Sequence, residues 1–155
     1  MYEEKGIGLD EAMKVMEAMI QEAKKDPSHP MAICIVDQRG EIVCSARMDG
    51  CQAFRPKMAF KKAYTAAQYR KSTRELGEVL KAQGLTIGDF ALENTTLIRG
   101  GEVISKPGGK AGALTETWIY QIVGAIGTSG GTVIEDEVLA KFGQKVAQGI
   151  LWPEK

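Results

Sequence analysis

The stretch VGAIGTSGGTVIEDEVLAKFGQKVA, residues 123–147, decides how this chain folds, because an apolar run leads through a cluster of glycines into a helical pattern. A strand, a glycine turn and a helix in this order also build phosphate-binding loops. Here no lysine follows the glycines as it does in a P-loop, and the initial G-x-G of a dinucleotide fingerprint is missing. The stretch therefore predicts a tight strand-to-helix turn, with close backbone packing or a neutral or metal-bearing ligand nearby.

The start of the helix argues further against a nucleotide site. Thr132 and Glu135 have the spacing of a capping box, in which the two side chains satisfy free backbone N–H groups. Glu135, Asp136 and Glu137 place three carboxylates in the first turn, where they complement the helix dipole. A phosphate would compete for the same N–H groups and would meet three negative charges.

Composition limits the remaining classes of protein. A chain of 155 residues predicts a single domain, residues 1–155. The 20 basic residues balance the 20 acidic ones, so no net field attracts nucleic acid or an anionic membrane. No apolar run approaches the roughly 20 residues of a membrane-spanning helix. The N-terminal MYEEKGIGLDEAM lacks the positive charge and the apolar core of a secretory signal, which predicts a cytoplasmic protein.

The order of the predicted elements favours an α+β fold. Apolar residues at helical spacing predict helices, and β-branched runs predict strands. The predicted helices are residues 8–25, 55–72, 73–84 and 132–149, and the predicted strands are residues 31–37, 41–49, 95–98, 102–105 and 119–127. A hairpin through Gln38, Arg39 and Gly40 joins the first two strands. Helices at both ends around these strands favour a sheet with its helices on one side.

Four segments together resemble the GlcG/HbpS family of haem-degrading and haem-binding proteins, which includes the carboxy-terminal domain of some corrinoid adenosyltransferases. These segments are AICIVDQRGEIVCSARMDG, MAFKKAYTAA, PGG and VGAIGTSGGTVIEDEVLA. The resemblance implies a profilin-like or PAS-like five-stranded antiparallel sheet with flanking helices, and a homo-oligomer. Some members bind haem or iron, and others lie in catabolic operons without settled chemistry. After Gly109 this chain lacks the expected GGVPI and is a few residues longer, which leaves a different ligand open.

The polar residues of the resemblance are Arg47, Asp49 and Lys62, followed by the Gly108–Gly109 turn. In one interpretation Arg47 and Lys62 clamp a carboxylate or a propionate, since a guanidinium binds such a group through two hydrogen bonds. In the other interpretation Asp49 forms an ion pair with Arg47 or Lys62 that fixes the loop. The sequence leaves both open.

Other candidates are read more simply. The single His29 lies between two prolines, without a second histidine or a cysteine at ligand spacing, which argues against a zinc site. His29 remains a weak candidate for an axial haem ligand, beside the alternative of a solvated loop residue. Arg55, Lys57 and Lys61 are interpreted as a solvated basic face.

Two classes of function are consistent with these residues. The first is an oligomeric small-molecule-binding protein whose ligand is haem or a carboxylated or planar metabolite. The second is a small catabolic enzyme, an isomerase, hydratase or lyase, that acts on an oxo-acid or a ring-cleavage product. In the second, Lys62 or Asp49 would act as acid or base beside Arg47. The sequence does not decide whether the protein is an enzyme.

The apolar strands predict assembly. AICIV and IYQIVGAI are almost wholly apolar, so a sheet with helices on one side would expose the other face. We therefore expect a homo-oligomer that is at least a dimer, built through the terminal helices and the segment Gly109–Trp118. The pocket lined by Arg47, Asp49, Lys62 and the Gly108–Gly109 turn is expected at that interface.

Overall fold

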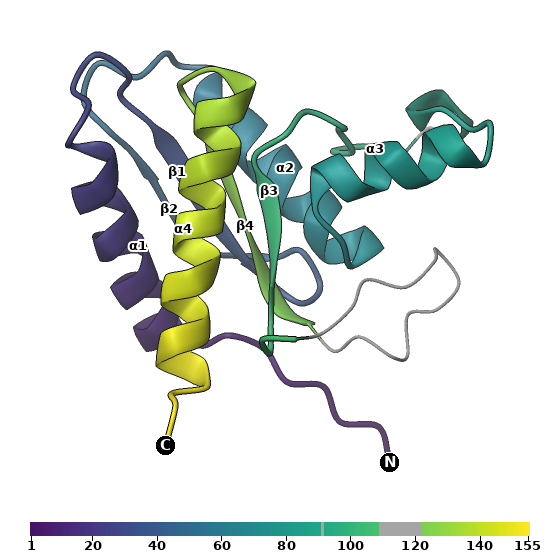
Figure 1. Ribbon diagram of the computed structural model, residues 1–155, viewed down its shortest axis with the longest axis horizontal. Helices are drawn as coiled ribbons and strands as arrows, with labels where there is room; N and C mark the ends of the chain where they lie inside the picture. Colours follow the sequence, from purple (N-terminus) through teal and green to yellow (C-terminus); the bar gives the residue numbers. More distant parts are fainter. Residues whose placement is uncertain (91, 109–121) are drawn as a thin grey trace.

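The computed structural model describes residues 1–90, 92–108 and 122–155, which form one α+β unit (Figure 1). Its elements are α1 (Leu9–Ala23), β1 (Ala32–Asp37), β2 (Ile42–Arg47), α2 (Arg55–Tyr69), α3 (Thr73–Ala82), the 3-10 turn η1 (Ile87–Asp89), β3 (Gly101–Ser105), β4 (Ile122–Ser129) and α4 (Val133–Leu151). The helices predicted from residue spacing are all present. In the part of the chain that is described, no helix has the length and apolar character needed to cross a membrane.

The four strands form one antiparallel sheet in the order β2-β1-β4-β3. Ala32, at the start of β1, lies opposite Arg47 at the end of β2 and opposite Ser129 at the end of β4. The start of β3 lies on the same side, because Gly101 pairs with Gly127. This edge, named here the Ala32 end, therefore gathers the loops that leave β2 and β4 and the turn that enters β1.

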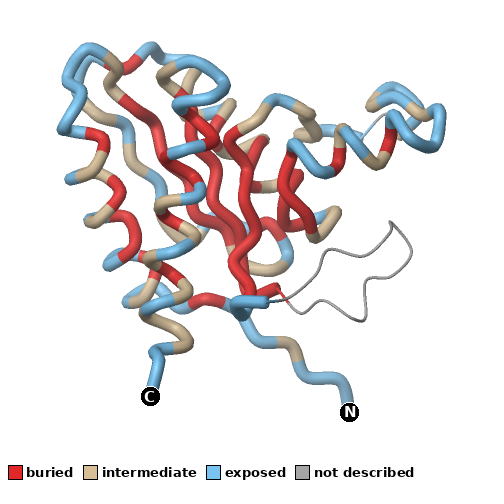
Figure 2. Tube along the Cα trace, in the orientation of Figure 1, coloured by how far each residue is buried: buried red, intermediate tan, exposed pale blue. Residues whose placement is uncertain are grey.

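Helices cover both faces of the sheet, so the expectation of helices on one side is wrong. Helices α1 and α4 cover one face and α2 covers the other (Figure 1). Ile33 and Ile35 pack in the core cluster with residues of α1 and α4, whereas Cys34 and Val36 pack in the cluster with residues of α2. All four side chains are buried, as are most residues of β1, β3 and β4, whereas the edge strand β2 is exposed or half-buried (Figure 2). The wholly apolar strands thus find their second cover inside the same chain. Among the described residues, the sheet therefore has no face left without helices, which was the reason to expect a homo-oligomer, and assembly stays a prediction.

The structure describes four strands where the resemblance implies five. Residues 95–98, expected as a strand, instead lie against α2, and the Thr96 N–H donates to the Thr65 hydroxyl over 2.9 Å. On β3, the Gln144 side chain donates to the carbonyl of Val103 over 2.7 Å, and Gln148 donates to that of Ser105 over 3.0 Å. Side chains of α4 thus satisfy carbonyls of this edge strand. Residues 109–121 lie outside the described residues.

The turn between β4 and α4 has the predicted capping box. The Thr132 hydroxyl accepts from the Glu135 N–H over 3.2 Å, and a Glu135 carboxylate oxygen accepts from the Thr132 N–H over 3.0 Å. Gly127 serves close packing, because a Cβ at this position would collide with the backbone of Ala59 and Ala63 in α2. The glycines therefore let α2 lie directly on the sheet, as the sequence suggested for close backbone packing.

Replacing Thr132 with alanine is expected to lower the free energy of unfolding by about 1 kcal/mol, because the hydroxyl cap is lost. Chemical denaturation measures the change. Thr86→Ala, at the exposed N-cap of the short η1, serves as a comparison and should lower the free energy of unfolding by less. An unchanged stability for Thr132→Ala would contradict the capping role.

Glu102 is a buried acid on the edge strand β3. Its side chain lies on β3 with only 5% of the residue exposed. The pKa of its carboxyl group is raised to about 7, mainly by burial and also by the charges of Glu75 and Glu137, while the charges of Lys141 and Arg74 lower it. The folded protein therefore keeps a proton on Glu102 at pH values where the unfolded chain has released it.

This raised pKa predicts a pH-dependent stability. The stabilising effect of the proton is complete below pH 4.5, the ordinary value for glutamate, and is lost as the pH rises through about 7. Glu102→Gln should therefore gain stability relative to the wild type between pH 5 and pH 8, by on the order of 2–3 kcal/mol at most. Urea denaturation across this range tests it, with the exposed Glu41→Gln as control. If the difference in free energy of unfolding between Glu102→Gln and the wild type does not change with pH, the raised pKa of Glu102 is refuted.

Candidate functional site

Three hollows surround the turn of residues 26–30 at the Ala32 end of the sheet. We name them by one residue each: the His29 pocket of about 410 Å³, the Arg47 pocket of about 350 Å³ and the Arg55 pocket of about 220 Å³. The His29 pocket is lined by Glu22, Ala23, Lys25, Asp26, His29, Met31, Ile134, Glu135, Val138, Leu139 and Phe142. The Arg47 pocket is lined by Ile20, Lys24, Pro27, Pro30, Ala46, Arg47, Met48 and Asp49.

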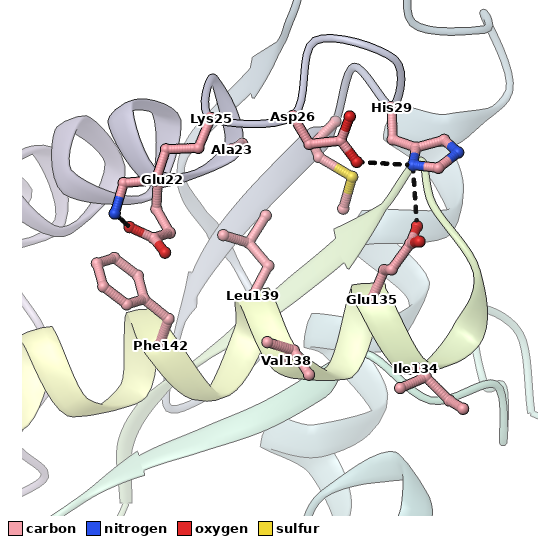
Figure 3. A pocket seen from close by; sticks show the side chains of 11 residues that line it. Glu22, Ala23, Lys25, Asp26, His29, Ile134, Glu135, Val138, Leu139 and Phe142 are labelled. Carbon is pink, nitrogen blue, oxygen red and sulfur yellow. Dashed lines mark hydrogen bonds and ion pairs between the residues drawn. The ribbon is translucent and has the colours of Figure 1, made fainter.

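The His29 pocket lies between the end of α1 and the first turns of α4. Apolar side chains of α4 line one side of it, among them Val138, Leu139 and Phe142 (Figure 3). His29 stands at its rim, with 44% of the side chain exposed. Small-molecule sites usually combine an apolar wall with a few polar groups. The volume of the His29 pocket is within the ordinary range of such sites, roughly 300–1,000 Å³.

Two carboxylates fix the orientation of the His29 ring. Its Nδ1 lies 3.1 Å from an oxygen of Asp26 and 3.2 Å from an oxygen of Glu135 (Figure 3). Because an ionised carboxylate only accepts hydrogen bonds, Nδ1 carries the proton in this geometry. In the neutral ring Nε2 then holds the free lone pair, and Figure 3 shows this nitrogen on the side away from both carboxylates. A histidine held in this way by a carboxylate is the usual form of a metal ligand.

Arg47 and Asp49 line the second hollow together, on the other side of the same turn. Both residues are exposed, and the part of the chain that the structure describes shows no ion pair between them. Of the two interpretations left open by the sequence, the loop-fixing pair of Arg47 with Asp49 is therefore not formed. Arg47 remains available to an anionic group in this pocket.

Lys62 is not part of either hollow. Its side chain is 1% exposed, and Nζ donates to a carboxylate oxygen of Asp136 and to the carbonyl of Thr128, each over 2.8 Å. Burial lowers the pKa of Lys62, and the hydrogen bond and charge of Asp136 oppose that shift. Lys62 therefore forms an ion pair, but with Asp136 and not with Asp49. Its amine lines none of the three hollows described here, from which it could clamp a carboxylate or transfer a proton to a ligand.

Gly108 lies away from the other predicted site residues. It follows β3, whose last residue Ser105 pairs with Ile122 at the edge of the sheet opposite the Ala32 end. Its φ of 84° suits a turn glycine, and a Cβ there would meet no atom within 4 Å. Gly109 and the segment to Trp118 lie outside the described residues. Within the described residues of this one chain, Arg47 and Asp49 share a hollow, and Lys62 and Gly108 do not line it.

Sequence reasoning missed the two carboxylates that hold His29. Asp26 is only three residues away, so the DPSHP turn itself carried a signal for this contact. Glu135 is contributed by α4, and only the fold brings it to His29. Arg55, interpreted as part of a solvated face, instead lines the third hollow.

Replacing Lys62 with methionine is expected to lower the free energy of unfolding by about 3–5 kcal/mol, because Asp136 would stay buried without its counter-charge. Thermal or chemical denaturation measures the loss. Lys57→Met, at an exposed position of the same helix, is the control and should change stability by less than about 0.5 kcal/mol. Similar small losses in both variants would show that the buried pair contributes little.

Comparison with known proteins agrees with this architecture. The model of the family described as "Haem degrading protein HbpS-like" matches residues 7–145. An uncharacterized 15.0 kDa protein from the dhaT-dhaS intergenic region of Citrobacter freundii is 28% identical over 130 residues, which are 84% of each chain.

Solved structures share the fold. A crystal structure of HbpS is 28% identical, with a TM-score of 0.75 over 94% of this chain and 93% of that one. A crystal structure of a PduOC:Heme complex is 22% identical, with a TM-score of 0.72 over 91% and 94% of the two chains, and shows likeness of fold. Because the family model covers most of the sequence, the chain belongs to the HbpS-like family.

Proposed function

We propose that this protein binds a planar small molecule in the His29 pocket, with haem as the principal candidate. The observation that carries the proposal is the placement of His29. Its Nδ1 is held by Asp26 and Glu135, and its Nε2 has no partner among the described residues. Figure 3 shows Nε2 on the outer side of the ring, away from Leu139 and Phe142, so a metal bound there would lie at the rim of the pocket. The membership of the family and the haem-bound relative of the same fold support this choice of ligand.

The residues present fit a haem in two respects. His29 has the tautomer that ligates iron, and Leu139, Phe142 and Val138 offer apolar surface to a macrocycle. The bound iron would supply the redox or ligand-binding chemistry. The chain itself would orient the ring of His29, and the two carboxylates would raise the basicity of its ligating nitrogen. Met31 and Ala23 would help to exclude water from the inner wall.

Charge indicates which edge of the ligand faces which side. Glu22, Asp26 and Glu135 make the His29 pocket acidic, and Lys25, which lines it, is paired with Glu22 over 2.7 Å. Propionate groups would be repelled there, so they are expected to point out of this pocket. We assign the contact with an anionic group of a ligand to Arg47, with Asp49 as a polar neighbour, in the hollow across the turn.

Assembly into a homo-oligomer remains part of the proposal. Its support is now the exposed apolar row of Ile134 and Val138, each 63% exposed, on the α4 side of the His29 pocket. A second copy that covers this row would also close the pocket from solvent.

Titration with hemin tests the proposal. In the wild type we expect a saturable shift of the Soret band, and in His29→Ala we expect the shift to be lost or the affinity to fall at least about tenfold. Asp26→Ala removes one of the two carboxylates that hold His29 and leaves the capping box of α4 intact, so its expected loss of about 10- to 100-fold in affinity would report on the orientation of His29. Light scattering on the same samples gives the mass of the assembly.

Glu17→Gln, exposed on α1 and outside the pocket, is the matched control and should bind hemin as the wild type does. Identical spectra for the wild type and His29→Ala would remove His29 from the site. An unchanged Soret band in every protein would remove haem as the ligand.

A further inference from the structure

A third hollow at the Ala32 end is built around a fixed arginine. Arg55 is the first residue of α2, and its Nε donates to the side-chain oxygen of Gln52 over 3.2 Å. Its Nη1 donates to the hydroxyl of Ser129 over 3.4 Å, and Ser129 is 1% exposed. These two contacts hold the guanidinium at the wall of the pocket of about 220 Å³ and leave further N–H groups without a protein acceptor in the part of the chain that is described.

The charge of Arg55 is not neutralised by the described residues. None of their carboxylates forms an ion pair with it, and the nearby Asp136 is engaged by Lys62 and by the N–H of Gly131. Cys51, which lines the pocket and is 8% exposed, does not compensate the charge. Burial raises the pKa of the Cys51 thiol, although Arg55 and Arg47 lower it, so the group is neutral at pH 7.

The backbone of α2 adds to the positive potential. The first turn of this helix has no acidic residue and no side-chain cap. The Arg55 N–H donates to the carbonyl of Gln52 over 3.1 Å and Pro56 has no N–H, so the helix contributes through its dipole. The positive end of the helix dipole therefore lies on the same side as the guanidinium. A small hollow with one fixed cation beside the positive end of a helix is suited to an anion.

We propose that the Arg55 pocket binds the carboxylate group of a small organic monoanion. A carboxylate matches the planar fork of a guanidinium. One uncompensated charge balances a monoanion, whereas a phosphate dianion would leave excess negative charge close to Asp136. The pyrrolidine ring of Pro30 and the thiol of Cys51 provide apolar surface for a short alkyl chain. The volume is below the roughly 300 Å³ of the smallest drug-sized sites, which restricts the ligand to a few heavy atoms.

This proposal does not depend on haem. The residues that line the Arg55 pocket and those that line the His29 pocket have no member in common, so either site can be present without the other. A failure of hemin to bind leaves the carboxylate site untouched, and the reverse also holds.

The test is a titration of the 15N-labelled full-length protein, followed by NMR of the backbone amides and of the Arg55 Nε–H. Propionate is expected to give saturable shifts that centre on Arg55, Cys51 and Gly130. Propionamide, which has the same shape without the charge, should give none. Inorganic phosphate should bind at least tenfold more weakly than propionate.

Variants locate the site. Arg55→Gln should weaken propionate binding at least tenfold, and Arg55→Lys, which keeps the charge but loses the planar fork, should weaken it severalfold. Arg39→Gln is the matched control, because it removes the same charge in the β1–β2 turn at the other end of the sheet, and it should bind as the wild type does.

Three results would overturn the proposal: equal shifts with propionamide, unchanged propionate binding in Arg55→Gln, or phosphate binding as tight as that of propionate. The comparison of the three probes in the wild type decides the ligand class even if Arg55→Gln does not fold.

Discussion

The buried ion pair between Lys62 and Asp136 is the contact on which the Ala32 end depends. It joins the middle of α2 to the first turn of α4, and the second hydrogen bond of Lys62, to the carbonyl of Thr128, adds the end of β4. Burying two charges is costly unless the pair is close and its remaining hydrogen bonds are satisfied. Asp136 meets this condition because its other oxygen accepts from the N–H of Gly131. The pair therefore fixes where α4 begins relative to the sheet.

That position determines what the surrounding turns can bind. Glu135 precedes Asp136 and reaches His29, while Ser129 ends β4 and reaches Arg55. The turn of residues 26–30 separates the resulting pockets, so an acidic histidine site and a cationic arginine site lie within one end of the domain without neutralising each other. In the same register, the last residue of β3 lies at the opposite end of the strands. The turn at Gly108 that follows it is therefore remote from these pockets.

Local patterns were enough to predict the helices, the hairpin and the capping box, because each depends on residues within a few positions of one another. The second helix layer was not predicted. Wholly apolar strands indicate that both faces of a sheet are covered, but they do not indicate which segment covers each face. Here Ala59 and Ala63 of α2 cover the second face. The candidate site was predicted less well. The partner of Lys62 and the second carboxylate at His29 both come from α4, and only the packing of α4 identifies them.

Glu135 links the candidate site to the fold through one atom. The same carboxylate oxygen accepts from the Thr132 N–H over 3.0 Å and lies 3.2 Å from Nδ1 of His29. An ionised carboxylate oxygen has lone pairs for both donors, so the helix start and the histidine orientation reinforce each other. When two interactions depend on one group, each changes the free energy of the other by the same amount. A metal bound to Nε2 of His29, as proposed, would strengthen the Nδ1 hydrogen bond and so favour the capped conformation of α4, with the neighbouring Asp136 in its pair with Lys62. The proposed ligand binding would thus be coupled to the stability of this end of the domain.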